Sequence, residues 1–424
     1  MGTGTPEVAY YGYVLARTGY GTAARGYVHA LDTASVPMSI VSLDRFPHPE
    51  LSDPVIHARM AGNRRFVPSL HVWHTEPHAV MKLARSFTRL VVLTTWEAES
   101  LPATYVEALN RAAEVWVPSH YNQRHFSEQL SVPVFRLPHP VNRIAEPRLE
   151  AEDFERELGL PQGCFVAVAV GTWQERKNLD GAIEAFLRAF PRERDAFLIV
   201  KTSFAFVDER MARSQIAAAI ARANVPDAAE AEKRIRIFPY YWPEDCLSSL
   251  LHRADCHLSL HRGEGWCYPL FDAASLGVPV VATGYSGPMD YLDGVHHSLV
   301  GYRLTAANQR RHTIRFAFDS SMNWAEPDLE DAALCLRRVY EDRQGARRRA
   351  SEAAATIRRR FSLDTVGEMA RLRVQQITEK ALRMEQESLI PTGAVDCASN
   401  DFVLPSATRP GRVSDSPWQP LVCN

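Results

Sequence analysis

The segment HRGEGWCYPLFDAASLGVPVVATGYSGPMDYL, residues 261–292, places two acidic side chains where they could bind a hydroxylated ligand. Glu264 lies eight positions before Asp272, and the pattern predicts a strand, a turn, a helix and a further strand. Glu264 then follows the strand and Asp272 lies in the opening turn of the helix, so both acids face the carboxyl edge of a sheet, where ligands bind in open α/β folds. Backbone N–H groups near the helix start can donate to phosphate or sugar oxygens, and the acids can accept from sugar or ribose hydroxyls.

Taken singly, each acid has a simpler explanation. An acid at a helix start is favoured by the helix dipole, which would account for Asp272, and Glu264 could be a solvated loop residue. The occurrence of both acids beside a glycine-flanked turn favours the interpretation that they form a binding site.

A basic loop supplies the complementary charge. In VAVGTWQERKNLDGAIEAFLRAF, residues 168–190, a strand is followed by a polar loop and a helix, and Arg176 and Lys177 stand just before the helix. Two cations at a helix N-terminus could hold a diphosphate. The alternative is an exposed loop whose cations are merely solvated.

Glycine and histidine residues mark strand ends in the first half. ARTGYGTAARGYVHAL, residues 16–31, puts Gly19 and Gly21 between a strand and a helix, although a G-x-G alone is common in tight turns. LHVWH, residues 70–74, ends a strand with His74, and a lone histidine is as often structural as functional.

Together these segments resemble retaining GT-B glycosyltransferases of family 4, the group 1 glycosyl transferases, over roughly residues 10–375, and particularly members linked to surface polysaccharides such as O-antigens. The family's donor motif has two glutamates separated by seven residues, and this chain has Asp272, one methylene shorter, in place of the second. Many relatives carry arginine directly after the strand-end glycine, where Thr172 stands here. Arg176 is the candidate replacement.

The resemblance implies a role for each matched residue. Arg176 and Lys177 would stabilise the leaving diphosphate and Glu264 would hold sugar hydroxyls. His74 would contact the transferred sugar, with His71 as a substitute. The implied donor-binding residues are Gly19, Gly21, Gly171, Gly265, Trp266, Cys267, Tyr268, Pro269, Leu270 and Asp272, the last of which would contact the ribose.

Residues 94–126 also resemble the family and supply candidates for the acceptor side. Glu97, expected to be exposed just past a strand, could meet the acceptor. Ser119 is placed to cap the following helix with Asn122, and ordinary packing and capping is the alternative explanation for this stretch. Tyr240 and Tyr241 are positional candidates for base recognition.

Short apolar runs alternate with helical segments in both halves, a pattern typical of parallel sheets with crossover helices. Strands are expected at 8–14, 39–44, 70–74, 89–95, 114–119 and 134–138, and then at 164–170, 196–202, 234–240, 255–261 and 278–283. Helices are expected at 179–190, 245–254 and 269–277, with Gly277 ending the last in a left-handed conformation. The predicted fold is therefore α/β, with two Rossmann-like doubly wound domains of the GT-B type facing a central cleft.

The predicted domains are an N-terminal acceptor-side domain at 1–145 and a donor domain at 146–325, with the linker near 142–160. Helices at 326–390, broken near Phe361 and Ser362, could pack back across the domains. Residues 391–424, rich in proline and serine, are expected to form a flexible tail.

Composition limits the function classes. A chain of 424 residues suits two domains, and 48 Lys plus Arg against 50 Asp plus Glu gives no field that would attract nucleic acid. The seven cysteines include no C-x-x-C pair, which favours reduced thiols. Without an apparent signal peptide or long apolar run, a cytoplasmic protein is expected, peripheral at the inner face of the membrane if its acceptor is lipid-linked.

The sequence thus predicts a retaining, metal-independent hexosyltransferase that uses a nucleoside diphosphate sugar and a hydroxyl acceptor, with no bound cofactor. Two alternatives stay open. One is a nucleotide-sugar epimerase or hydrolase of the same fold. The other is an inactive nucleotide-sugar-binding partner subunit, which the departures at Asp272 and Thr172 would suit.

Overall fold

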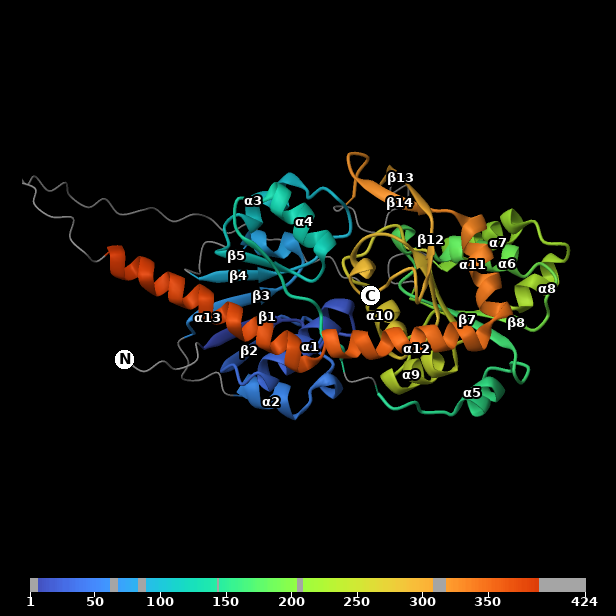
Figure 1. The fold of residues 1–424 in the computed structure, drawn as a ribbon, viewed down its shortest axis with the longest axis horizontal. Helices are drawn as coiled ribbons and strands as arrows, with labels where there is room; N and C mark the ends of the chain where they lie inside the picture. The colour runs from blue at the N-terminus through green and yellow to red at the C-terminus, as the bar shows by residue number, and fades with distance from the viewer. Residues whose placement is uncertain are drawn as a thin grey trace, which may run out of the picture. The chain divides into compact units, whose positions relative to one another are not determined.

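The apolar runs of the first half form a six-stranded parallel sheet in the order β2-β1-β3-β4-β5-β6 (Figure 1). This computed structural model describes residues 7–61, 68–82, 89–142, 145–203, 209–307 and 318–388. All six predicted strands are confirmed, most of them shorter than expected. They are β1 (Val8–Gly12), β2 (Met38–Ser42), β3 (Leu70–His74), β4 (Leu90–Leu93), β5 (Glu114–Val117) and β6 (Val134–Arg136).

Helical segments connect these strands. They are α1 (Gly19–Thr33), η1 (Pro49–Leu51), α2 (Pro54–Ala61), η2 (Pro77–Lys82), α3 (Ala103–Leu109) and α4 (His120–Gln129). Tyr27 and Val28 of α1 are buried in one core with Tyr10 of β1, which fixes α1 against the sheet. Because the chain passes from β1 to β2 on one side and returns to β3 on the other, the carboxyl ends of β1 and β3 flank a switch point, where ligands bind in such sheets.

The second half builds another six-stranded parallel sheet, in the order β12-β11-β10-β7-β8-β9, which is the strand order of a Rossmann fold. Its strands are β7 (Phe165–Val170), β8 (Ala196–Lys201), β9 (Ile235–Phe238), β10 (Cys256–Ser259), β11 (Val280–Thr283) and β12 (Ser298–Val300). The switch point of this sheet lies between β7 and β10. The predicted α/β class with two doubly wound sheets is confirmed.

The helices of the second half agree with the prediction where one was made. They are α5 (Ala151–Glu157), η3 (Glu175–Lys177), α6 (Leu179–Ala189), α7 (Glu209–Ala223), α8 (Ala228–Lys233), α9 (Glu244–Arg253), α10 (Tyr268–Ser275) and η4 (Gly287–Asp290). Gly277 has the expected left-handed φ of 74° after α10. A small antiparallel pair, β13 (Tyr302–Ala306) and β14 (Asn323–Pro327), was not predicted.

The segment expected to be a plain linker, 142–160, contains helix α5. Phe154 of this helix is buried in a core with Val166 of β7 and Leu250 of α9, so the second part of the segment belongs to the packing of the second sheet. Arg253 of α9 reinforces the contact through an ion pair with Glu155, at 2.6 Å.

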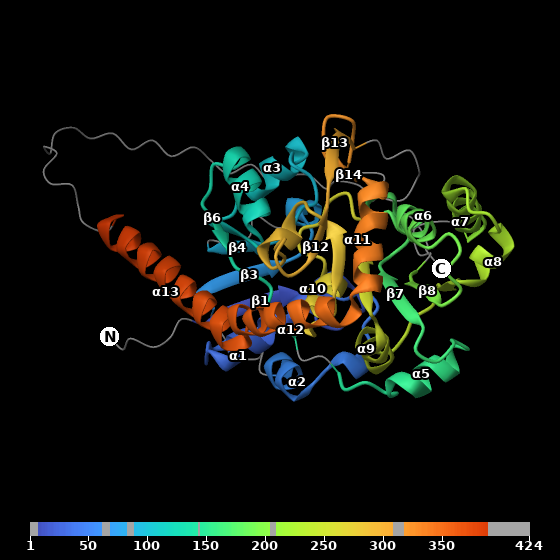
Figure 2. The same ribbon diagram turned by 45° about the vertical axis from the view of Figure 1, so that its right-hand side comes forward.

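The last helices are α11 (Leu329–Glu341), α12 (Arg343–Arg360) and α13 (Leu363–Ser388), and the break at Phe361 and Ser362 is confirmed. Figures 1 and 2 both show α13 beside α1, and Val366 and Val374 of α13 are buried in the core that contains β1 and α1. The chain divides into a compact unit, Met1–Glu379, and a short unit, Lys380–Asn424. The predicted tail at 391–424 lies outside the described residues.

None of the helices in the described ranges is long and apolar enough to cross a membrane.

Candidate functional site

Two loops meet at the switch point of the second sheet, one after β7 and one after β10. Asn178 ends the first loop with a left-handed φ of 52° and its side-chain amide donates to the carbonyl of Leu260, at 2.9 Å. The N–H of Arg262 donates to the carbonyl of Arg176, at 2.8 Å. These bonds hold the two loops together, so the basic and acidic segments of the sequence share one place in the fold.

The loops bring both predicted cations onto the predicted acid. Glu264 is 4% exposed and pairs with Arg176 at 3.0 Å and with Lys177 at 2.6 Å, one cation for each carboxylate oxygen. Burial alone would raise the pKa of Glu264, but Arg176 and Lys177 lower that pKa to about 2. Glu264 therefore stays ionised, and the cluster concentrates two positive charges and one negative charge in a nearly dry site.

Glu97 extends this cluster from the first half of the chain. Its carboxylate lies 3.4 Å from Arg176, and 23% of its side chain is exposed. The expectation of an exposed Glu97 is therefore wrong, because the ion pair draws the side chain inward. Burial and the nearby charge of Glu264 raise the pKa of Glu97, although Arg176 opposes them.

Glycine residues allow the loop after β10 to approach the first half closely. A Cβ on Gly263 would overlap the carbonyl oxygen of Glu97, and a Cβ on Gly265 would overlap the hydroxyl of Thr95. A Cβ on Gly171, after β7, would lie 3.5 Å from the Cδ of Lys177, which is an ordinary contact distance. Glycine at positions 263 and 265 thus allows the close approach of the two segments.

We expect Gly263→Ala to lower the free energy of unfolding by about 1–3 kcal/mol, because the added methyl group meets backbone that cannot rotate away. Gly19→Ala is the matched control, since a Cβ at Gly19 meets no atom within 4 Å and alanine suits the helix better than glycine. Urea denaturation of both variants checks this. Equal stability of Gly263→Ala and the parent would contradict the close approach.

The residues predicted to offer backbone amides to the donor lie just before and at the start of α10. Cys267 precedes the helix with a left-handed φ of 71°, a conformation that costs energy for a residue with a side chain and is often found at functional sites. Pro269 has no N–H to offer, and the backbone of Leu270 faces the Cys267 thiol, whose pKa it lowers against the effect of burial. Gly265, Trp266 and Tyr268 stay the better candidates for amide contacts.

Asp272 lies in the second turn of α10, because the helix already begins at Tyr268, and the expectation of an opening-turn position is wrong. Burial, together with the charge of Glu244, raises the pKa of Asp272 to about 7. Glu244 begins α9 and lies 3.5 Å from Arg25 of α1. Asp272 thus stands apart from the Glu264 cluster, beside a second set of charged residues.

His74 ends β3 at the switch point of the first sheet, as predicted. It is 2% exposed, and its Nδ1 is 2.7 Å from the hydroxyl of Tyr10. Burial lowers the pKa of His74 to about 3, so its ring is neutral. His71 lies earlier on the strand, where its Nδ1 is 3.2 Å from the hydroxyl of Tyr11.

The glycine loop after β1 forms the start of α1. Thr18 caps the helix by accepting from the N–H of Gly21, at 3.1 Å, and a Cβ on Gly21 would overlap the carbonyl of Ala16. Tyr20, between the two glycines, places its ring 5.5 Å from the ring of His74. Gly19 and Gly21 therefore lie on the same side of the first sheet as His74.

Ser119 caps α4, as predicted, by accepting from the N–H of Asn122, at 3.2 Å. Asn122 in turn donates to the carbonyl of Trp96, at 2.6 Å, and accepts from the hydroxyl of Thr95, at 2.9 Å. The Ser119 side chain is fully buried in this role, which makes capping the better supported of its two explanations.

His139 is a residue of this region that the sequence did not indicate. It follows β6, its ring stacks on that of Tyr268 with centroids 5.0 Å apart, and it meets the ring of Trp266 at 5.4 Å. Among the described residues, its Nδ1, the Trp266 Nε1 and the Tyr268 hydroxyl are buried without a hydrogen-bond partner. A histidine between two prolines at a strand end was the available clue.

Comparison with known proteins finds a family match in the part of the chain that contains the charged cluster. The model of the family "Glycosyl transferases group 1" matches residues 150–301, which run from α5 to β12 and contain Arg176, Lys177 and Glu264. No curated protein matches the chain significantly.

Solved structures of similar architecture are numerous. HepE from Anabaena, in complex with UDP and glucose, is 15% identical, with 89% of this chain and 100% of that chain covered at a TM-score of 0.59. Sucrose-phosphate synthase from Thermosynechococcus elongatus is 14% identical, with coverage of 89% and 100% and a TM-score of 0.62. A glycosyltransferase from Rickettsia africae is 13% identical, with coverage of 92% and 100% and a TM-score of 0.62. These similarities establish the predicted GT-B fold.

Proposed function

We propose that this chain is a glycosyltransferase that moves a hexosyl unit from a UDP-sugar to a hydroxyl acceptor. The observation that carries the proposal is the convergence of Arg176 and Lys177 on Glu264 at the switch point of the second sheet. Two largely buried cations, with side chains 11% and 18% exposed, at the carboxyl ends of parallel strands suit a diphosphate. HepE structures of the same fold hold UDP with glucose, or UDP-glucose, which supports uridine as the nucleoside.

In the proposed reaction the bond between sugar C1 and the diphosphate oxygen breaks, and its electron pair leaves with UDP. The acceptor oxygen bonds to C1 from the same face, its proton passes to the departing phosphate oxygen, and the anomeric configuration is retained. Arg176 and Lys177 would offset the charge that grows on the leaving group, without a metal ion or bound cofactor.

The diphosphate must compete with Glu264 for both cations. Because it carries more negative charge than a single carboxylate, we expect it to replace Glu264 at Arg176 and Lys177. Glu264 would then accept hydrogen bonds from the hydroxyls of the sugar, close to the amides of Gly265 and Trp266. In this scheme the free site is held in place by the residues that later hold the donor.

On the first-sheet side, the neutral ring of His74 would contact the transferred sugar. Tyr10 occupies Nδ1, which leaves Nε2 for a sugar hydroxyl. Glu97 is the acceptor-side candidate, since the hydroxyl of Ser119 is engaged in capping α4. The acceptor class that we propose is a surface polysaccharide or its lipid-linked precursor, reached at the cytoplasmic face of a membrane.

Thermal unfolding with UDP-, GDP-, ADP- and dTDP-sugars tests the donor site, followed by product analysis with hydroxyl acceptors. We expect UDP-sugars to stabilise the protein, by about 2.7 kcal/mol at a hundredfold excess over Kd, and Lys177→Ala to weaken the effect. No stabilisation by any member of the panel would overturn the proposal. Free sugar or an epimer formed without acceptor would indicate a hydrolase or epimerase, and binding without turnover an inactive partner subunit.

Donor binding should depend on pH through Asp272. With its pKa at about 7, only about a tenth of this carboxyl is ionised near pH 6 and about nine tenths near pH 8. Since the carboxylate accepts from ribose hydroxyls, we expect UDP to bind about tenfold more tightly at the higher pH. Calorimetric titrations measure how UDP affinity changes with pH in the parent and in Asp272→Asn. The variant lacks the titrating carboxyl, so its pH dependence reports the titration of UDP itself. Equal slopes would exclude the ribose contact.

For the stability of the free protein we expect the opposite pH dependence, because the Asp272 carboxyl should stabilise the fold more at low pH than at high pH. The native state holds the Asp272 proton more tightly than the unfolded chain does, because the folded pKa is raised. Its contribution to the free energy of unfolding is therefore full below about pH 4 and is lost as the pH rises through about 7.

A further inference from the structure

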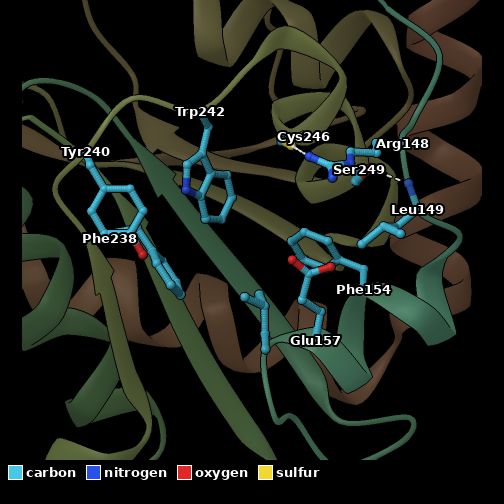
Figure 3. A pocket seen from close by; sticks show the side chains of 10 residues that line it. Arg148, Leu149, Phe154, Glu157, Phe238, Tyr240, Trp242, Cys246 and Ser249 are labelled. Atoms are coloured by element: carbon cyan, nitrogen blue, oxygen red, sulfur yellow. Dashed lines mark hydrogen bonds between the residues drawn. The ribbon is translucent and has the colours of Figure 1, made fainter.

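A cavity of about 310 Å³ lies between α5, the end of β9 and α9, and none of its lining residues belongs to the charged cluster (Figure 3). Its volume is at the lower end of the range of about 300–1,000 Å³ that is typical of ligand pockets. A single ring fits such a volume better than a nucleoside diphosphate sugar. The lining residues are Arg148, Leu149, Phe154, Glu157, Leu158, Phe238, Tyr240, Trp242, Cys246 and Ser249.

Four of the ten lining residues carry aromatic rings. Trp242 lies 5.0 Å from the ring of Phe238 and 6.4 Å from that of Phe154, and Phe238 lies 6.1 Å from Tyr240. Figure 3 shows Phe238, Tyr240 and Trp242 on one side of the cavity and Phe154 with Glu157 on the other. A flat ligand with an apolar face could therefore lie between them.

The polar groups of the cavity carry opposite charges. Arg148 and Glu157 are both exposed, and the Arg148 guanidinium is 3.6 Å from the Cys246 thiol. Ser249 is already engaged, since it accepts from the N–H of Leu149 and donates to the carbonyl of Asp245. A diphosphate would be repelled by Glu157 and a cation by Arg148. A hydroxyl can accept from the guanidinium and donate to the carboxylate.

The cavity and Glu244 lie on different faces of α9. Cys246 and Ser249 are on the face of α9 that also carries Arg253, which pairs with Glu155 of α5. Glu244, at the start of the same helix, instead lies beside Arg25 of α1. A ligand in the cavity would contact the side chains of Tyr240 and Trp242, in the loop after β9.

We propose that this cavity is a second saccharide site, which binds one uncharged hexose ring of a glycan. The ring would stack on Trp242, and neighbouring hydroxyls would bridge Arg148 and Glu157. The site does not depend on the assigned donor site, so either assignment can fail while the other stands.

Alkylation of Cys246, followed by peptide mass spectrometry, reports on the cavity directly. The probes are methyl α-glucoside, methyl α-mannoside and methyl β-galactoside, with UDP as a separate arm. At a concentration of about four times Kd, a bound glycoside should slow alkylation about fivefold, because only the free fraction reacts. We expect this protection to persist in Lys177→Ala, whose proposed nucleotide site is impaired.

Two variants test the contacts, and a third is the control. Trp242→Leu and Glu157→Gln should abolish or strongly weaken the protection, whereas Glu152→Gln, on the same helix but outside the cavity, should retain it. The Glu157→Gln result decides the matter if Trp242→Leu does not fold. Three outcomes would overturn the proposal: no protection by any glycoside, protection unaltered in both variants, or protection by UDP alone, which would make the cavity part of the nucleotide site.

Discussion

Arg176→Met is expected to lower kcat/KM for the UDP-sugar by about 10³-fold, because it removes a preorganised positive charge from the leaving diphosphate. The guanidinium also faces Glu97 and Glu264, at 3.4 and 3.0 Å, and both carboxylates would lose this partner. We therefore expect the free energy of unfolding to fall as well, by about 3 kcal/mol. Steady-state kinetics and urea denaturation measure the two effects separately.

Arg253→Met is the matched control for this variant. Arg253 is also a largely buried arginine that faces two carboxylates, those of Glu155 and Asp255, at 2.6 and 2.9 Å. Its loss should destabilise the protein to a similar degree while kcat/KM at low temperature stays within about threefold of the parent value. If both variants lost activity to a similar degree, the loss in Arg176→Met would be explained by reduced stability alone. That result would contradict the proposed contact of Arg176 with the diphosphate.

Glu264→Gln is expected to move two measurements in opposite directions. Turnover should fall by about 10²-fold, because a neutral amide is a weaker acceptor for the sugar hydroxyls. UDP alone should bind about tenfold more tightly, because the diphosphate no longer competes with a carboxylate for Arg176 and Lys177. Calorimetry with UDP and turnover of the UDP-sugar report the two changes.

Glu114→Gln separates these effects from the general loss of a buried charge. Glu114 is as buried as Glu264 and accepts from Arg373 of α13, at 2.7 and 2.5 Å, far along the first sheet. We expect Glu114→Gln to lower the free energy of unfolding with little change in UDP affinity. If Glu264→Gln bound UDP no more tightly than the parent, the competition between donor and carboxylate would be refuted.

Most of the fold could be predicted because parallel strands buried on both faces appear as continuous apolar runs, as VAVAV does in β7. Elements without such a run were missed. β13 is exposed along most of its length, so YRLTA shows no buried face. Helix α5 depends largely on the burial of Phe154 and lies between Pro147 and Pro161, which concealed it in a segment that resembles a linker.

The charged residues of the site could be predicted from their positions at strand ends, but their pairing could not. Arg176 and Glu264 are far apart in sequence and meet because β7 and β10 are neighbours in the sheet. Strand order is a long-range property that local patterns do not contain. His139 illustrates the same limit, since its significance depends on Trp266 and Tyr268 from the other half of the chain.

Helix α13 has a consequence for the order in which the protein is made. Its residues Val366 and Val374 complete the core around β1 and α1, and a Cβ on Gly367 would overlap the carbonyl of Ala30. During synthesis the first sheet emerges earliest, yet part of its core is supplied by this last helix. The second sheet forms much of its core with α6, α9 and α11, which are nearer to its strands in sequence. Assembly on the ribosome would then run against the usual order, in which the N-terminal domain folds first, and would leave the earliest-made strands in need of protection for longest.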